Sequence, residues 1–246
     1  MNSTIKNLTN HRSERSYLDK AIPEEVINNI IEAAYRAPTS VNSQQVSVVV
    51  TRAQENRNKI AEIAGGQPWI KQAPLFLTFV LDMHKSEQAI SAHGGEQLAH
   101  ESIEALVSGS TDIGIALASA MAAARAEGLG VVPIGGIRRD PEAMIELLAL
   151  PTLTFPVVGL AIGYVDQPAH LKPRLPMATF RHEEAYRTDG LAEQIEKYNA
   201  DIQQHWKNIG RNDGDSWSES VGGYYKNIYF PQVLPAVIKQ GFGTKK

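Results

Sequence analysis

Two short clusters of basic residues are the parts of this 246-residue sequence best suited to bind an anion. The first cluster is His11-Arg12-Ser13-Glu14-Arg15, and the second is Lys172-Pro173-Arg174-Leu175-Pro176. Arginine, histidine and serine side chains can hold a dianionic phosphate through charge-assisted, partly bidentate hydrogen bonds. Side chains alternate along an extended segment, so Lys172 and Arg174 present two cations on one side. Taken alone, each cluster is more often a solvated surface than a ligand site.

Three further segments lie between the two basic clusters. They are Ala37-Pro38-Thr39-Ser40-Val41-Asn42-Ser43-Gln44-Gln45, Gly65-Gly66-Gln67-Pro68-Trp69 and Pro133-Ile134-Gly135-Gly136-Ile137-Arg138-Arg139. In their order and approximate spacing, the five segments together resemble the nitroreductase-like flavoproteins. More narrowly, they resemble the branch of oxygen-insensitive NADPH nitroreductases and flavin reductases. The resemblance runs from about Thr4 to about Trp217.

The resemblance implies a site for flavin mononucleotide (FMN) and assigns binding roles but no catalytic side chain and no metal. The residues implied to grip the phosphate and ribityl chain are His11, Arg12, Ser13 and Arg15, with Lys172 and Arg174 closing from the other side. The residues implied to contact the ring or ribityl chain are Gln67, the backbone of Ile134, Gly135 and Gly136, and Ser40 and Asn42 of the opposite protomer. The glycine pair suits this role on physical grounds, because only glycine lets the main chain approach a flat ligand without a Cβ atom in the way.

Each of these residues also has an ordinary structural explanation. His11 could cap its own turn, and Gln67 could lie beside the end of a helix. Gly135-Gly136 could form a turn at the end of a strand, while Ser40 and Asn42 could be common turn residues. Only the conjunction of the five segments favours a flavin site.

The implied reaction is two-electron transfer. NAD(P)H would pass a hydride to flavin N5, and an oxidant would then take the place of the nicotinamide, which gives ping-pong kinetics. Nitroaromatics, quinones or free flavin are the implied small-molecule oxidants. The alternatives are a related flavin chemistry such as dehalogenation or flavin breakdown, a non-enzymatic flavin-storing or redox-sensing dimer, and a scaffold without cofactor.

Two positions depart from the family's pattern. The relatives that use NADPH carry two arginines just before an Asp-Thr/Ser-Trp element, where they hold the 2′-phosphate. Here Asp213-Gly214 precede Asp215-Ser216-Trp217, and only Arg211 stands close enough to bind NAD(P)H in their place. Asp213 would repel a 2′-phosphate, so the sequence does not support a preference for NADPH, and NADH is an acceptable reductant. The second departure is Pro133, where relatives often carry an aromatic residue.

Composition narrows the class of protein. A net charge of −3 disfavours nucleic acid as a partner, because such binders usually carry a basic surplus. The absence of cysteine removes disulfides, thiolate catalysis and iron–sulfur clusters, so any redox chemistry needs a bound cofactor. We see no signal peptide and no apolar run approaching the roughly 20 residues of a membrane span, so a cytoplasmic protein without a membrane partner is expected.

The resemblance implies an α+β, nitroreductase-like fold with a central, mainly antiparallel sheet of about four to five strands flanked by helices. Apolar and β-branched runs predict strands at 46–51, 74–82, 130–134 and 155–165. Helical spacing, prolines and glycines predict helices beginning after Pro23 and covering 56–64, 104–127, 141–149 and 191–209. Residues 84–103 lack a pattern and are expected to form a loop, with room for a helical portion.

We expect an FMN-binding core over residues 1–189 and a C-terminal extension over 190–246. The extension is rich in aromatic residues, which rarely lie in water in such number. The resemblance implies a homodimer in which the extension is exchanged between subunits, while packing of the extension on its own core is the alternative. The small residues of the helix at 104–127 suit either burial within one subunit or a dimer interface.

Overall fold

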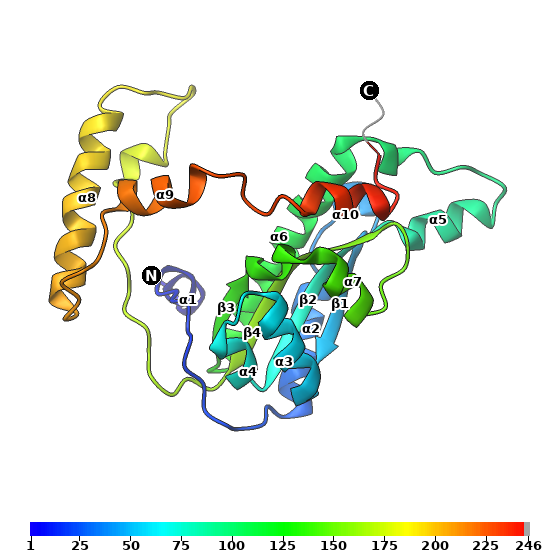
Figure 1. The fold of residues 1–246 in the computed structure, drawn as a ribbon, viewed down its shortest axis with the longest axis horizontal. Coiled ribbons are helices and arrows are strands. Elements are labelled where there is room, and N and C mark those ends of the chain that lie inside the picture. Colours follow the sequence, from blue (N-terminus) through cyan, green and yellow to red (C-terminus); the bar gives the residue numbers. More distant parts are fainter. Residues whose placement is uncertain (244–246) are drawn as a thin grey trace. The chain divides into compact units, whose positions relative to one another are not determined.

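A four-stranded antiparallel sheet forms the centre of the protein in a computed structural model that describes residues 1–243 (Figure 1). The strand order is β1-β2-β4-β3, and every neighbouring pair is antiparallel. The strands are β1 (Val46–Thr51), β2 (Leu75–Asp82), β3 (Gly130–Ile134) and β4 (Thr154–Gly163). The four predicted strands and the α+β class are confirmed.

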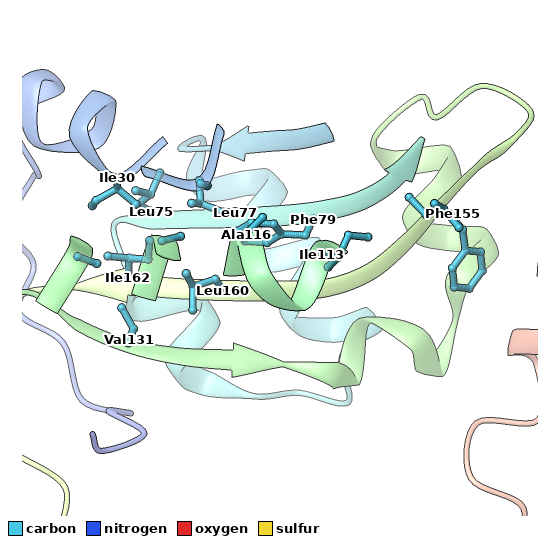
Figure 2. Close-up of a cluster of buried hydrophobic side chains, with 14 of the residues drawn as sticks. Ile30, Leu75, Leu77, Phe79, Ile113, Ala116, Val131, Phe155, Leu160 and Ile162 are labelled. Atoms are coloured by element: carbon cyan, nitrogen blue, oxygen red, sulfur yellow. The ribbon is translucent and has the colours of Figure 1, made fainter. Parts of the chain in front are cut away.

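The two central strands are buried on both faces, as the apolar sequence of β2 predicts. Leu75, Leu77 and Phe79 of β2 point to one side, where they meet Leu160 and Ile162 of β4 (Figure 2). Phe76 points to the opposite side and belongs to a second apolar cluster. The sheet therefore separates two hydrophobic layers, each covered by its own helices.

The first layer is covered by α2 (Glu24–Tyr35) and α6 (Ile103–Ala126), and the second by α3 (Gln54–Ile63), α4 (Pro68–Gln72) and α7 (Pro141–Leu147). The sequence signals act as expected at the helix ends. The side chain of Asp140 accepts a hydrogen bond from Ala143 N at the start of α7, and Gly128 has a positive φ of 78° directly after α6.

Helix α6 is long and apolar enough, by length and composition, to cross a membrane, and it is the one such helix in residues 1–243. The core helix of a globular protein passes the same test. Ile113, Ala116, Ala120 and Ala124 of α6 lie in the first hydrophobic layer, packed against α2 and the sheet. Its packing explains its composition.

Several helices lie outside the segments predicted to be helical. Residues 84–103 contain a helical portion, for which the loop prediction left room, namely α5 (His84–Ser91) and the 3-10 turn η2 (Ala99–Glu101). The N-terminal helix α1 (Ser3–Thr9) begins after Asn2, whose side chain accepts a hydrogen bond from Ile5 N. Helix α4 has Pro68 at its first position, a placement typical of a helix start, although no helix was predicted there.

The contacts divide the chain into two compact units. The first consists of residues 1–169 and 230–246, of which the structure describes those up to residue 243, and the second consists of residues 170–229. The second unit contains η4 (Met177–Thr179), α8 (Leu191–Asn208) and α9 (Trp217–Tyr225). Ser216 and Glu219 form a capping box at the start of α9. The end of the chain belongs to the first unit, where α10 (Val233–Lys239) is followed by the fully buried Phe242. The division at residues 189 and 190 remains a prediction.

Candidate functional site

The first basic cluster is fixed by its main chain. Glu14 N donates to Val131 O of β3 at 3.0 Å, and Leu18 N donates to Tyr164 O at 2.9 Å. Tyr17 pairs with Val165 in an isolated antiparallel bridge. The segment thus lies against β3 and the end of β4, and its position does not depend on its exposed side chains.

Glu14 is the one acidic residue of the first basic cluster, and it is buried. Its Oε2 accepts a hydrogen bond from Ala169 N at 2.7 Å. Burial and the charge of Glu14 raise the pKa of the Tyr17 hydroxyl well above its usual value, and that hydroxyl donates to Glu14 O at 2.8 Å. The acidic side chain is engaged by the protein itself, so the remaining side chains of the cluster can all donate to an anion.

Arg15 extends from the cluster over the indole ring of Trp69, with its guanidinium carbon 5.3 Å from the ring centroid. Its Nη1 also donates to Ser13 O at 3.3 Å. The Nε atom of Arg12 and the Nε1 atom of Trp69 are buried and have no hydrogen-bond partner among residues 1–243. A buried donor without an acceptor is costly, which indicates that an acceptor is missing here.

Gln67 and Gly136 lie in direct contact near Trp69. Gln67 precedes α4, and its Nε2 donates to Ala64 O at 3.0 Å. A Cβ atom on Gly136 would lie 2.5 Å from Gln67 Nε2 and 2.8 Å from Ala64 O, so only glycine fits. Gly135 and Gly136 begin the 3-10 turn η3 (Gly135–Arg139), directly after the buried Ile134 at the end of β3. The structure therefore links Arg15, Trp69, Gln67 and Gly136 in one region.

Ser40 and Asn42 lie at the other end of the sheet. They form the turn η1 (Ser40–Asn42) before β1, whose first residue, Val46, pairs with Leu81 of β2 and through it with Phe155 of β4. The first basic cluster meets β3 at Val131, which pairs with Ile162 of β4. Figure 2 shows Ile162 and Phe155 at opposite ends of the sheet. Seven residues of strand separate the two positions, or about 23 Å, so one chain does not bring both groups to one flavin ring.

The second basic cluster belongs to the second unit and is held by side chains of α8. The hydroxyl of Tyr198 donates to Pro173 O at 3.0 Å, between Lys172 and Arg174. Burial raises the pKa of that hydroxyl, and the charge of Arg174 partly offsets the increase. The Lys172 ammonium lies 4.9 Å from the ring centroid of Trp206.

Trp206 also carries Arg211, whose guanidinium carbon lies 4.8 Å from the same ring centroid. The indole is fixed in turn, because its Nε1 donates to Asp215 O at 3.0 Å and a Cβ atom on Gly214 would lie 2.2 Å from the ring. Arg211 forms an exposed ion pair with Asp213, with Nε and Oδ1 3.8 Å apart. One tryptophan thus supports a cation of the second basic cluster and the cation expected to meet NAD(P)H.

The residues of the first unit fit the phosphate and the ring of FMN. Two guanidinium groups, an imidazole and a hydroxyl can all donate to an anion, and one of those donors, Arg12 Nε, is buried with no acceptor in residues 1–243. The close backbone approach at Gly136 beside the Gln67 amide suits the edge of a flat heterocycle.

Comparisons with known proteins agree with this geometry. The model of the nitroreductase family matches residues 8–164, and that of its C-terminal domain matches residues 172–245. The chain belongs to the nitroreductase family. It is 41% identical to the FMN reductase [NAD(P)H] of Bacillus subtilis over 249 residues and 32% identical to the oxygen-insensitive NADPH nitroreductase of Salmonella typhimurium over 247 residues, with all of every chain covered. The solved structure of NfrA2 from B. megaterium superimposes with a TM-score of 0.98 at 41% identity, again over all of both chains.

The family and the fold of this nitroreductase are as the five segments predicted. Sequence reasoning missed the side chains that hold those segments, namely Glu14, Trp69, Asp112, Tyr198 and Trp206. Trp69 and Glu14 had a signal, because each lies in one of the five segments. The other three lie outside those segments, and Asp112 and Tyr198 contact residues far away in the sequence.

Proposed function

We propose that this nitroreductase is an FMN-dependent NAD(P)H oxidoreductase that reduces nitroaromatics, quinones or free flavin. The names of its relatives, which include FMN reductases and NADPH nitroreductases, support that class. The observation that carries the proposal is the grouping of donors in the first unit. A main-chain-fixed basic turn stands beside Trp69, Gln67 and Gly136, with donors that lack an acceptor among the described residues.

In this proposal His11, Arg12, Ser13 and Arg15 hold the phosphate and ribityl chain. Gln67 donates to the ring, and the backbone of Ile134, Gly135 and Gly136 lies against it. Bound FMN supplies a group that accepts a hydride from NAD(P)H and passes two electrons to the oxidant. The chain's own residues bind and orient it, no side chain is assigned as an essential acid or base, and water supplies the protons.

We further propose that the protein works as a homodimer. In one chain, the strand positions next to the turn Ser40–Asn42 and next to the first basic cluster are about 23 Å apart along β4, so Ser40 and Asn42 serve the flavin of the second copy. Two more features support this arrangement. Ile103, Val107 and Ile115 of α6 are exposed, and so are Tyr224 and Tyr225 of α9, which suits an extension exchanged between subunits.

Lys172 and Arg174 complete the phosphate site in this proposal, and Arg211 contacts the pyridine nucleotide. Asp213 pairs with Arg211 and places a negative charge where a 2′-phosphate would lie. NADH is therefore accepted alongside NADPH. We place the enzyme in the cytoplasm, where both reductants are available.

An anaerobic visible spectrum tests the proposed function. The purified protein, supplied with FMN, is mixed with NADH and with NADPH in separate cuvettes. Bleaching of the flavin band, followed by its return when a quinone or nitroaromatic is added, is the expected result. The ratio of the two bleaching rates reports the effect of Asp213.

Two other outcomes would overturn the proposal in different ways. A bound flavin that neither nucleotide reduces would indicate a storage or sensing protein. A protein that binds no FMN would remove the basis of every site residue named above.

A further inference from the structure

A buried carboxylate on α6 holds the turn that carries Ser40 and Asn42. Asp112 has only 4% of its surface exposed. Both its oxygens lie 3.1 Å from Ser40 N, and Oδ2 also accepts a hydrogen bond from Gln45 Nε2 at 2.8 Å. Among residues 1–243, no basic side chain forms an ion pair with Asp112. These donors alone offset the cost of burying the charge.

The turn held by Asp112 has an unfavourable backbone. Val41, Asn42 and Gln44 have φ angles of 47°, 55° and 50°, in the left-handed region. This region is uncommon for any residue other than glycine and is an outlier for β-branched valine. Val41 is 94% exposed, so packing of its side chain does not stabilise the conformation. The conformation has to be imposed by hydrogen bonds at the base of the turn.

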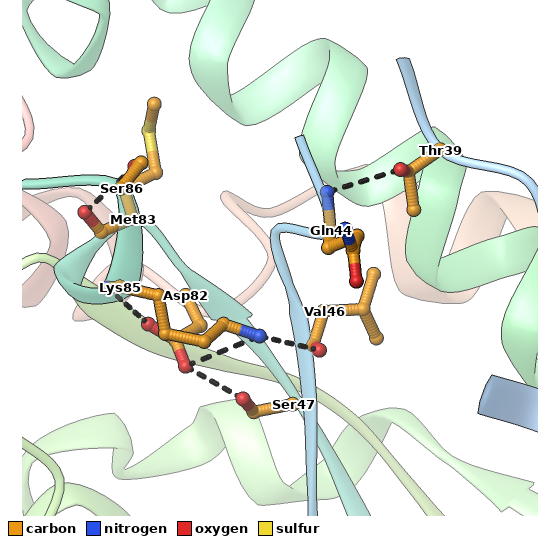
Figure 3. Close-up of polar contacts among 8 residues, drawn as sticks. All are labelled: Thr39, Gln44, Val46, Ser47, Asp82, Met83, Lys85 and Ser86. Carbon is orange, nitrogen blue, oxygen red and sulfur yellow. Dashed lines mark hydrogen bonds and ion pairs between the residues drawn. The ribbon is translucent and has the colours of Figure 1, made fainter. Parts of the chain in front are cut away.

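Hydrogen bonds secure both ends of the turn. Gln44 N donates to Thr39 Oγ1 at 3.0 Å, which closes the loop across its base (Figure 3). Gln45 O accepts from Asp82 N at 3.0 Å and ties the following residue to the end of β2. Asp112 anchors both sides of the turn to α6, since it receives Ser40 N before the strained residues and the Gln45 side chain after them. Strain of this kind persists where the surroundings over-determine it, and it concentrates at binding sites.

We propose that Asp112 is a positioning residue for the flavin site of the second copy in the dimer. It sets the backbone of Ser40–Asn42 so that the exposed tip of the turn meets FMN in one conformation. This inference rests on the proposed function, in which Ser40 and Asn42 contact that flavin. Asp112 does not touch the flavin itself, because it is buried and both its oxygens are already engaged.

The test exchanges the carboxylate and the amide between Asp112 and Gln45, which are hydrogen-bonded to each other. In D112N the new side chain keeps an oxygen for Ser40 N–H, but its amide group faces the Gln45 amide, which has to turn over so that its oxygen accepts, and neither hydrogen bond is any longer to a charged group. We expect FMN affinity to fall about tenfold, the scale of one lost hydrogen bond to a charged group. The double variant D112N/Q45E returns a carboxylate to the pair, which accepts from the amide group of the new side chain at unchanged net charge. Its affinity should return to within about threefold of the parent.

Gln240→Ala is the matched control. Gln240 is also buried, and its side chain donates to Pro151 O and Thr154 O, away from the turn. Its loss should lower the free energy of unfolding without changing FMN affinity. The visible circular dichroism of bound flavin should change in D112N, recover in D112N/Q45E and stay constant in Q240A. Parental affinity in D112N, or no recovery in the double variant, would overturn the inference.

Mixed dimers separate this inference from the proposed function. A dimer of one R15A chain and one D112N chain has one site with both changes and one site with neither, if each turn serves the opposite flavin. Half of its sites should then bind FMN with parental affinity. If every site in the mixed dimer is weakened, Asp112 acts within its own chain and the inference is wrong, although FMN binding stands. Failure of the unmodified protein to bind FMN would instead overturn the proposed function.

Discussion

The two basic clusters are alike in sequence but are held in place by different means. The first is fixed through its main chain, with Glu14 N bonded to Val131 O and Tyr17 bridged to Val165. The second contains no helix or strand and is held by side chains of α8, with Tyr198 bonded to Pro173 O and Trp206 beneath Lys172. A main-chain bond survives most substitutions, whereas a side-chain contact depends on one residue. The first cluster should therefore be sensitive only to its own residues, and the second also to residues of α8.

The largest effect is expected where a phosphate contact is removed outright. Arg15→Ala and Arg174→Ala should each weaken FMN binding about tenfold to a hundredfold, because a hydrogen bond to a charged group contributes roughly 1.5–3 kcal/mol. Fluorescence titration of apoprotein with FMN measures the effect. Arg52→Ala is a matched control, since Arg52 lies in the same unit and its exposed side chain pairs with the exposed Glu24. Unchanged affinity in both cluster variants would remove the phosphate assignment.

A smaller effect is expected from Trp206, and it sharpens the comparison directly. Trp206→Ala removes the ring beneath Lys172 and Arg211, so FMN affinity should fall about threefold to tenfold, the range of a cation–π contact. Trp206→Phe keeps an aromatic face but loses the hydrogen bond to Asp215 O, so its FMN affinity should lie between that of the parent protein and that of Trp206→Ala. Titration with FMN measures the consequence for Lys172, and the KM for NADPH measures the consequence for Arg211.

Trp206 does not belong to the predicted site, so its importance would show that the second cluster depends on α8. Parental FMN affinity and parental KM in Trp206→Ala would show instead that the second cluster keeps its shape without that support.

The elements of the fold were predictable where local pattern decides them. Val46–Thr51 and Gly130–Ile134 are strands with the predicted bounds, because β-branched runs favour a pleated, buried surface whatever lies beside them. Residues 84–103 were predicted less well. Helix α5 contains few apolar residues, and the buried Gln97, whose side chain donates to Met83 O, gives no sign of its role in the sequence.

The candidate site divides in the same way. The binding residues stand in short motifs, so the sequence names them. Their supports come from elsewhere in the chain, as with Asp112, which lies 72 residues from Ser40. Such a contact has no local signature, because a single aspartate within an apolar helix does not indicate in the sequence which distant backbone it holds. The distance between Ser40 and the first basic cluster is likewise a consequence of sheet register, which strand prediction alone does not supply.

The smallest effect is expected from His205, which lies next to Trp206 on α8. Burial, then the neighbouring His170 and Lys172, lower the pKa of its imidazole below the usual value. In the unfolded chain the imidazole of His205 has its usual pKa of about 6.5. Below that pH the unfolded state binds a proton at His205 more readily than the folded state does. Stability should therefore decline as the pH falls through 6.5 toward the folded-state pKa, with no contribution from His205 above that range.

Urea denaturation at pH 7.5 and at pH 5.5 measures this contribution. His205→Gln should lose less stability between the two pH values than the parent does. His93→Gln, which alters an exposed histidine of the first unit, should lose as much as the parent. An equal loss in His205→Gln and in the parent would mean that the packing around Trp206 admits a protonated imidazole at no cost. The second cluster would then be looser than its side-chain contacts indicate, and the contrast with the main-chain-fixed first cluster would be greater still.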